Sequence, residues 1–202
     1  LLSNIKGVGF IVSEQIEKAK EAGPFQDIYD CFSRLYIAGI GKKMLEDFIY
    51  ANVFSNFGFN RATLIYHLDS LFNYAELTKD IDPSLVMRPE IEVQKEYDDS
   101  FLLEKEKELF GFYLSSHPVT MYKKDNKDCI SLSLVKNHLN KLLDVLILVE
   151  KVKVITTKKG DKMAFVTGSD ETGTMEFIFF PAVYQNDIRL ERGALLKARG
   201  RV

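Results

Sequence analysis

The 202-residue sequence contains no tryptophan, two cysteines, three histidines and five prolines. The two cysteines, Cys31 and Cys129, lie far apart, and neither has a second Cys or a His at zinc-ligand spacing. This pattern is not that of a disulfide framework or of a structural zinc site. We expect both thiols to be reduced and buried as small apolar side chains.

Long hydrophobic runs are also missing. No apolar stretch approaches the roughly 20 residues that a membrane-spanning helix needs, and the opening residues, Leu1 to Lys6, lack the layout of a secretory signal. We therefore expect a cytoplasmic protein that makes no membrane contact. The chain does not begin with methionine, and Val202 ends what looks like a strand. Both features predict a piece excised from a longer protein.

The chain has no excess of positive charge, since its formal net charge is −2. This argues against the uniformly basic surface of many nucleic-acid-binding proteins. Residues 65–142 carry 10 Lys and Arg against 14 Asp and Glu, and residues 143–202 carry 10 against 8. The acidity therefore lies in the middle of the chain.

Catalytic signatures are absent as well. A two-metal active site needs carboxylates that hold two divalent ions, and the acidic pairs here are Asp80 with Asp82 and Asp98 with Asp99. The first pair lies in a proline-containing segment. The second precedes a predicted helix, where Asp favours the helix N-terminus. With no Walker loop and no Ser-His-Asp set, we expect no catalytic residue, no metal and no cofactor in this chain.

Apolar residues at spacings of three and four predict short helices over residues 1–75. A charged helix is predicted over residues 98–114, ended by Ser115 to Pro118 because the residue before a proline avoids the helical region. Residues 78–97 contain Pro83 and Pro89 and show no period, which predicts an extended linker.

From about residue 143 the apolar period changes to two, which predicts strands. The predicted elements are strands around residues 152–154, 163–166, 175–180 and from 194, and a short helix or turn over 181–187. This order is that of an OB-fold barrel, with its last strand cut off at Val202. We therefore predict an α+β multidomain chain. Its parts are an all-α region over 1–75, a linker and helical connector over 76–142, and an incomplete OB-fold over 143–202.

The strongest chemical signal is a glycine pattern that occurs twice. Ile5-Lys6-Gly7-Val8-Gly9 resembles the helix-hairpin-helix motif, and Ile37-Ala38-Gly39-Ile40-Gly41 repeats it 32 residues later. Two glycines let the backbone turn tightly and approach a phosphate, with the N–H groups of the following helix directed at the anion. Such contacts do not read sequence and weaken with salt. The alternative is a tight interhelical turn without a ligand.

A second candidate surface is a lysine-rich hairpin in the predicted OB-fold, where such folds present a loop to single-stranded nucleic acid. We expect the aromatic side chains Phe165, Phe177, Phe179 and Phe180 mainly in the barrel core, with base stacking as their alternative. The predicted DNA-binding residues are Lys6, Gly7, Val8, Gly9, Phe10, Gly39, Ile40, Gly41, Lys42, Lys43, Lys153, Lys158, Lys159 and Lys162, with Lys151 beside them.

Four blocks together resemble the C-terminal part of the alpha subunit of bacterial DNA polymerase III. They are residues 5–9, residues 43–49 with 60–62, the run from Glu104 to Pro118, and residues 172–176. Hairpins placed before an OB-fold resemble the form of this subunit that lacks an exonuclease. The resemblance implies that the hairpins hold duplex product and that the OB-fold lies near single-stranded template. It also implies a nucleoid-associated parent polymerase whose catalytic aspartates, with Mg²⁺, lie upstream.

Members of this family commonly carry a short sliding-clamp-binding peptide between the hairpins and the OB-fold. The nearest match is the run from His67 to Phe72, which lacks the usual Gln. Its candidate clamp-binding residues are Leu68, Leu71 and Phe72, and helix core is their alternative role. The acidic middle also leaves open a protein-interaction module that contacts the sliding clamp or clamp loader. A third alternative is an unrelated hairpin and OB-fold protein, such as a ligase fragment.

Overall fold

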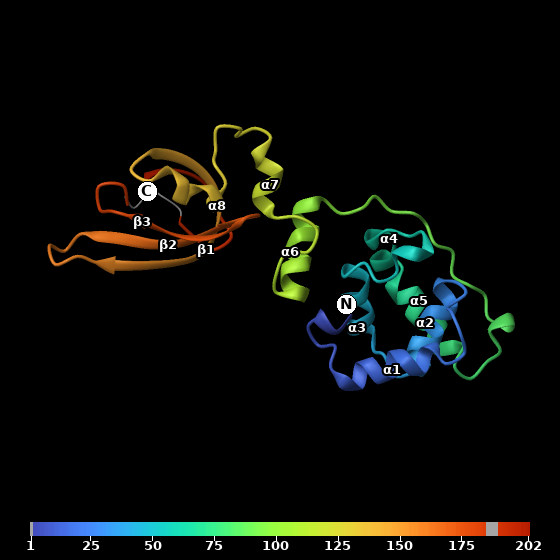
Figure 1. Ribbon diagram of the computed structural model, residues 1–202. Coiled ribbons are helices and arrows are strands. Elements are labelled where there is room, and N and C mark those ends of the chain that lie inside the picture. The colour runs from blue at the N-terminus through green and yellow to red at the C-terminus, as the bar shows by residue number, and fades with distance from the viewer. Residues whose placement is uncertain (1, 185–189) are drawn as a thin grey trace. The chain divides into compact units, whose positions relative to one another are not determined.

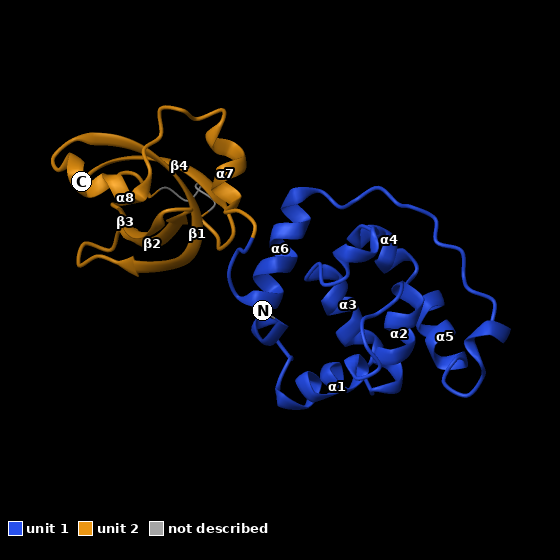
Figure 2. Cartoon of the chain, turned by 45° about the vertical axis from the view of Figure 1, so that its right-hand side comes forward, with its two compact units in different colours: residues 1–114 blue, residues 115–202 orange. Residues whose placement is uncertain are grey.

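The computed structural model describes residues 2–184 and 190–202, and the chain divides into two compact units (Figure 2). Residues 1–114 form a helical unit, and residues 115–202 form a unit built on a β-sheet. The α+β architecture is confirmed. The boundary between the units follows residue 114, whereas the sequence placed boundaries at residues 75 and 142, because the segments on either side of 114 pack onto their neighbouring elements.

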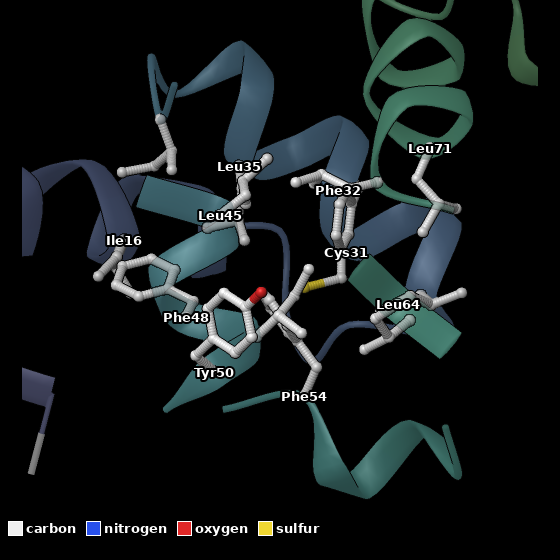
Figure 3. Packing of buried hydrophobic residues seen from close by; sticks show 14 of the residues in the cluster. Ile16, Cys31, Phe32, Leu35, Leu45, Phe48, Tyr50, Phe54, Leu64 and Leu71 are labelled. Carbon is white, nitrogen blue, oxygen red and sulfur yellow. The ribbon is translucent and has the colours of Figure 1, made fainter. Parts of the chain in front are cut away.

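The helical unit consists of short helices joined by tight turns (Figure 1). Its elements are the 3-10 helices η1 (Leu2–Asn4), η2 (Ser55–Phe57) and η3 (Pro83–Leu85), and the α-helices α1 (Phe10–Lys20), α2 (Ile28–Ile37), α3 (Lys42–Tyr50), α4 (Arg61–Tyr66), α5 (Leu68–Leu77) and α6 (Asp99–Phe110). Side chains from α1 to α5 meet in one core, in which Phe32, Leu45 and Leu71 are fully buried (Figure 3). Each such side chain contributes about 1.5–3 kcal/mol by leaving water.

Both cysteines are free thiols, as expected, but only one is fully buried. Cys31 packs in the core of the helical unit (Figure 3), and burial raises the pKa of its thiol to about 12, so it stays protonated and behaves as an apolar side chain. Cys129 is half-buried. The expectation of a buried side chain was therefore wrong for Cys129.

Two helix boundaries differ from the sequence prediction. Helix α6 ends at Phe110 because Gly111 adopts a left-handed conformation with φ of +79°, and its N–H donates to the Lys107 carbonyl at 3.0 Å. Pro118 does not end this helix. It begins α7 (Pro118–Lys123), because proline suits the first helical position. His67 separates α4 from α5, so the run from His67 to Phe72 begins at a helix boundary.

Of the predicted extended linker over 78–97, residues 86–97 are extended, but residues 78–80 form a turn and residues 83–85 form η3, and the extended part is not a free linker. We call residues 86–97 the strap, because hydrogen bonds fasten them along the helical unit. The bonds run from Tyr29 Oη to the Pro89 carbonyl (2.7 Å), from the Glu92 N–H to His67 Nε2 (2.9 Å), from the Gln94 N–H to Thr63 Oγ1 (2.9 Å) and from Asn60 Nδ2 to the Gln94 carbonyl (2.8 Å). The predicted linker is thus part of the helical unit's surface.

Near its end the strap carries the carboxylate of Glu96, which accepts hydrogen bonds from groups at the start of α4. Glu96 accepts hydrogen bonds from the N–H groups of Ala62 (3.1 Å) and Tyr97 (3.0 Å) and from Nε of Arg61 (3.0 Å). Burial alone would raise the pKa of Glu96, but these donors outweigh burial and hold its pKa below the ordinary 4.5. The ionised carboxylate is therefore stabilised by folding.

The described residues of the sheet unit form four antiparallel strands in the order β3-β2-β1-β4. Its elements are α7, α8 (Leu132–Val135), η4 (Lys136–His138), β1 (Leu142–Thr156), β2 (Lys162–Asp170), β3 (Gly173–Phe179) and β4 (Leu195–Arg201). The first half of β1 pairs with β4 and the second half with β2, so one long strand joins both parts of the curled sheet (Figure 1). The four predicted strands are present, and the OB-fold is confirmed. Of the predicted helix or turn over 181–187, residues 185–189 lie outside the described residues.

An irregularity in β1 decides which side chains face the core. The register shifts between Val149 and Lys151, which marks a β-bulge. Val145 and Ile147 pack in the core before the bulge, and Val152 packs in it afterwards. Because the bulge changes the parity of the strand, Lys151 and Lys153 lie on the face opposite the core.

The turn between β2 and β3 is closed by a buried carboxylate. Asp170, 4% exposed, accepts hydrogen bonds from the N–H (2.7 Å) and hydroxyl (2.6 Å) of Thr172. Its second oxygen accepts the N–H of Leu132 at 2.9 Å, at the start of α8. One side chain therefore shapes the hairpin and fastens α8 against the sheet.

The hydrogen bonds that Glu96 of the strap accepts predict that the free energy of unfolding decreases in acid. Because the pKa of Glu96 lies below 4.5 in the folded protein, its contribution is complete above pH 4.5 and is lost as the pH falls through the folded-state pKa. We expect Glu96→Gln to lower the free energy of unfolding by roughly 1 kcal/mol at neutral pH. The difference between wild type and variant should shrink in acid. Urea unfolding followed by far-UV circular dichroism measures both quantities.

Glu90→Gln is the matched control, because Glu90 is an exposed carboxylate of the same strap. It should leave the unfolding midpoint unchanged at every pH. A Glu96→Gln variant as stable as wild type at neutral pH would contradict this role of the strap.

Candidate nucleic-acid interface

The two glycine repeats form turns of the same backbone shape. We call residues 5–9 the first hairpin and residues 37–41 the second hairpin. Gly7 and Gly39 adopt left-handed conformations with φ of +91° and +94°. Gly9 and Gly41 are extended and immediately precede α1 and α3. The apolar residues between the glycines, Val8 and Ile40, are buried. The sequence repeat is therefore also a structural repeat.

Each hairpin packs against the helix that follows the other. A β-carbon at Gly7 would lie 3.4 Å from Cε of Met44 in α3. One at Gly39 would lie only 2.7 Å from Nε2 of Gln15 in α1, and that amide donates to the Gly39 carbonyl at 3.3 Å. The positive φ and the close approach both require glycine at residue 39. This packing holds the two hairpins as one body.

Both hairpins present backbone donors at the start of a helix. The Gly41 carbonyl accepts the N–H groups of Met44 (3.0 Å) and Leu45 (3.1 Å), so the N–H groups of Lys42 and Lys43 have no acceptor within the helix. In the first hairpin the Gly9 carbonyl accepts the N–H of Ser13 at 3.1 Å. The N–H groups of residues 10–12 therefore have no acceptor within the helix either. Such N–H groups, at the positive end of the helix dipole, suit a phosphate.

Acidic neighbours reduce the positive charge at the second hairpin. Lys42 forms an ion pair with Asp69 of α5. Lys43 lies 3.1 Å from Asp47 and 3.2 Å from Glu46, and hydrogen bonds to these two carboxylates raise its pKa. These pairs are solvent-exposed and therefore weak, so a phosphate can compete for the lysines. The predicted cations are in place, but each has an acidic partner.

Lys6 lies in the first hairpin with an exposed side chain. Its backbone N–H donates to the Leu109 carbonyl of α6 at 2.8 Å, which fastens the hairpin to that helix. In the described part of the chain its ammonium group forms no ion pair. The first hairpin therefore keeps one unpaired cation.

The exposed face of the sheet carries lysines beside apolar side chains. In the strand register Lys153 is opposite Phe165, which is opposite Ile178, so the three side chains form one row across β1, β2 and β3. Ile178 is 48% exposed. Lys151 and Lys153 lie on this face, and Lys158, Lys159 and Lys162 lie in or beside the β1–β2 turn. All five are exposed, and none forms an ion pair within the residues that the structure describes. We call this row and these lysines the sheet face.

The expectation for the aromatic side chains holds in part. Phe177 and Phe179 pack in the sheet core, as predicted. Phe165 lies on the opposite face, and Phe180 is 59% exposed. Sequence reasoning missed Ile178, although its alternation with Phe177 and Phe179 already placed it on the other side of β3.

The candidate clamp-binding residues are not exposed. Leu68 is 6% exposed and Leu71 is fully buried in the helical core. Phe72 packs edge-on against Tyr36, with ring centroids 5.2 Å apart. This placement matches the alternative role in the helix core. A partner could reach Leu68 and Leu71 only if the helical unit opened.

Neither a metal cluster nor a membrane helix is found in the described residues. No three His, Cys, Asp or Glu side chains of residues 2–184 and 190–202 gather closely enough to hold a metal ion. None of the described helices has the length and apolar character needed to cross a bilayer.

Comparison with known families identifies the class of both units. Residues 2–64 match the family described as helix-hairpin-helix motif, and residues 148–202 match the OB-fold nucleic acid binding domain. The first match contains both hairpins, and the second contains the sheet face. The helical unit thus contains a match to a helix-hairpin-helix motif, and the sheet unit contains a match to an OB-fold nucleic acid binding domain.

Three similar proteins share the name DNA polymerase III subunit alpha. The chain is 35% identical over 99% of its length to DNA polymerase III subunit alpha of Bacillus subtilis, and 32% identical over 89% to the subunit of that name from Staphylococcus epidermidis. The Halalkalibacterium halodurans subunit is 29% identical over 93% of the chain. The resemblance to this subunit is confirmed. The chain spans under a fifth of the length of these relatives, 19%, 17% and 18%.

The hairpin geometry predicts unequal effects of two neighbouring glycines. Gly39→Ala should destabilise the helical unit by about 2 kcal/mol, because the β-carbon meets Gln15 and φ stays positive. Gly41→Ala should cost less than about 1 kcal/mol, because its conformation suits any residue and its β-carbon would meet no atom within 4 Å. Urea unfolding of both variants tests this order. Equal midpoints would contradict the hairpin geometry.

Proposed function

We propose that this chain is a DNA-holding segment of a DNA polymerase III alpha subunit and that it grips DNA without reading its sequence. The observation that carries the proposal is the structural repeat, in which two glycine hairpins each present the unbonded N–H groups of a helix start. The similarity to alpha subunits over nearly the whole chain supports the parentage.

The helical unit holds duplex DNA through the phosphate backbone. The N–H groups after Gly9 and Gly41 bind phosphate oxygens, and Lys42 and Lys43 exchange their carboxylate partners for phosphate. Two hairpins in one body suit the two backbones of a duplex. Because the carboxylates Glu46, Asp47 and Asp69 oppose the approach of DNA, affinity is modest and strongly salt-dependent.

The sheet unit holds single-stranded DNA on the sheet face. Lysines of β1 and of the β1–β2 turn attract the backbone, and Phe165 and Ile178 offer an apolar surface to unpaired bases. Cations beside an aromatic side chain suit a flexible single strand better than a duplex, whose base faces are covered by stacking. The two units thus hold different forms of DNA.

In this proposal the chain assists synthesis and performs no chemistry itself. DNA-templated polymerisation, with its Mg²⁺ and catalytic aspartates, belongs to other segments of the parent, which is a protein of the bacterial cytoplasm. The described residues of this chain supply positioning and retention of DNA.

A second candidate function is contact with a sliding clamp or another replisome protein. The observation in its favour is a segment that runs from the end of α5 into the start of the strap and carries exposed apolar side chains. There Leu77 is 53% exposed, Leu85 79% and Met87 91%. Exposed apolar surface of this kind is typical of interaction sites. This segment, rather than the buried Leu71, is the accessible candidate for a clamp-binding peptide.

Fluorescence anisotropy with labelled duplex and single-stranded oligonucleotides at two salt concentrations tests the proposal. Lys42→Gln with Lys43→Gln should weaken duplex binding. The slope of log affinity against log salt concentration should become shallower by roughly 1 to 2, since each lost phosphate contact removes about 0.9 from its magnitude. Lys153→Gln with Lys158→Gln and Lys159→Gln should weaken mainly single-strand binding. Lys124→Gln with Lys127→Gln removes exposed lysines elsewhere and should change neither.

The two candidate functions are separated by a parallel pull-down with the sliding clamp. Leu85→Ala with Met87→Ala should reduce clamp capture and leave DNA binding intact. Absence of binding to either DNA at low salt, with the far-UV spectrum of a folded chain, would rule out the DNA-holding role.

A further inference from the structure

Three polar side chains of the sheet unit form one continuous hydrogen-bonded chain. Nε2 of His117, the residue before α7, lies 3.1 Å from Oγ of Ser169 in β2, and that hydroxyl donates to Oε1 of Glu150 in β1 at 2.9 Å. The other ring nitrogen, Nδ1, accepts the N–H of Val119 at 3.3 Å and so caps the start of α7. We call His117, Ser169 and Glu150 the side-chain link, because together they join one helix to two strands.

The groups at the two ends of the link fix the direction of every hydrogen bond in it. A backbone N–H can only donate, so Nδ1 of His117 carries no proton and the neutral ring has its proton on Nε2. A carboxylate can only accept, so the Ser169 hydroxyl donates to Glu150 and its oxygen accepts from Nε2. The imidazole therefore cannot take the Ser169 proton, and the three residues do not have the arrangement of a catalytic triad.

The link ends on the residue that makes the bulge in β1. Val149 is opposite Gly168 and Lys151 is opposite Thr167, so Glu150 is the extra residue of the strand. An extra residue is left out of the regular backbone pairing of a sheet. The bond from Ser169, a side chain that is only 6% exposed, therefore anchors a position that backbone pairing leaves unfixed.

This anchor bears on the sheet face, because the bulge sets which side chains lie there. Val149 and Val152 pack in the core, so Glu150 and Lys151 between them lie outside it, and Lys153 follows on the outer face. A carboxylate next in sequence to Lys151 would compete with a phosphate for the ammonium groups. Its bond to Ser169 holds that carboxylate toward β2 instead.

Other charged groups of these elements have partners of their own. The Asp170 carboxylate accepts the N–H groups of Thr172 and Leu132, and Lys123 of α7 forms an ion pair with Glu171. The carboxylate that acts on the imidazole is Glu150, through the Ser169 hydroxyl. Its negative charge favours a proton on Nε2, the nitrogen at that end of the ring, over one on Nδ1.

We propose that His117 is a positioning residue for the sheet face. Its neutral imidazole aligns the Ser169 hydroxyl, Ser169 holds the Glu150 carboxylate at the bulge, and the bulge keeps Lys151 and Lys153 outward. The effect on DNA rests on the proposed single-strand contact, whereas the hydrogen-bonded link does not depend on it.

The protonation of the ring can be observed directly. Long-range ¹⁵N–¹H spectra of the labelled chain are recorded at about pH 8, above the ordinary histidine pKa of about 6.5. They should show a proton on Nε2 of His117 and none on Nδ1. A proton on Nδ1, in the other neutral form or in a charged ring, would overturn the link, because Nδ1 could not then accept the Val119 N–H.

Two conservative substitutions divide the link. His117→Asn keeps an acceptor near the place of Nδ1 and is a good residue at a helix N-cap, but it is too short to reach Ser169. His117→Gln keeps a donor near the place of Nε2 and loses the cap. His138→Gln is the matched control, because His138 is the other histidine of the sheet unit and its Nδ1 lies 3.1 Å from the Leu134 carbonyl.

Amide hydrogen exchange reports on the bulge through two backbone bonds beside it. The Val149 N–H donates to the Ala194 carbonyl and the Gly193 N–H to the Val149 carbonyl, both at 2.8 Å. We expect these two amides to exchange roughly five- to tenfold faster in His117→Asn and as in wild type in His117→Gln. The Val119 amide should show the reverse order, and the control should change none of them.

Far-UV circular dichroism establishes that each variant is folded. Unchanged exchange at Val149 and Gly193 in folded His117→Asn, or the same change in both His117 variants, would overturn the positioning role.

Anisotropy with a labelled single strand tests the consequence for binding. His117→Asn and Ser169→Ala should each weaken binding roughly two- to fivefold, the range set by one neutral hydrogen bond, and His117→Gln should bind as wild type does. Full affinity in His117→Asn, despite faster exchange at the bulge, would overturn the positioning role and leave DNA holding intact. If wild type binds no single strand, the proposed function of the sheet unit fails together with the effect on DNA, and the exchange data still decide whether the link holds the bulge.

Discussion

The helical unit depends on one constraint, the close approach of each glycine hairpin to the helix that follows the other. Gly39 leaves room for the Gln15 amide, and Gly7 lies against Met44. A side chain at either glycine would strain a left-handed backbone as well as fill the contact. Because this packing fixes the starts of α1 and α3 in one body, the free N–H groups of both helices are preorganised. In the proposed function, the binding chemistry therefore comes from backbone positions that Gly7 and Gly39 help to create.

The sheet unit also places its candidate binding residues on one surface, but it does so through a β-bulge and a closed turn. A bulge in β1 reverses the parity of the strand, so that Val152 enters the core and Lys153 reaches the outer face. Asp170 closes the β2–β3 turn that brings Ile178 into the same row. Cations and apolar side chains thus share one face, as the proposed single-strand contact requires. In the proposed function, each unit places a few ordinary residues where a DNA backbone can be held.

Local patterns could be predicted from the sequence, and distant partners could not. The glycine repeat, the four strands and the core positions of Phe177 and Phe179 follow from spacing alone. The ion pair of Lys42 with Asp69 and the anchoring of the strap by Glu96 join residues far apart in sequence, so no spacing reveals them. The run around Leu71 resembles a linear peptide, yet folding buries it. Burial is a property of the whole unit, which a short motif does not contain.

The central claim is that backbone N–H groups of both hairpins hold DNA. Amide chemical shifts of the isotope-labelled chain, recorded during titration with a duplex carrying an overhang, test it most directly. The account predicts shifts that saturate together for residues 10–12 and 42–43, with a second set on the sheet face around Lys153 and Phe165. Binding that shifts the sheet face alone, and leaves both hairpins unchanged at saturation, would contradict it.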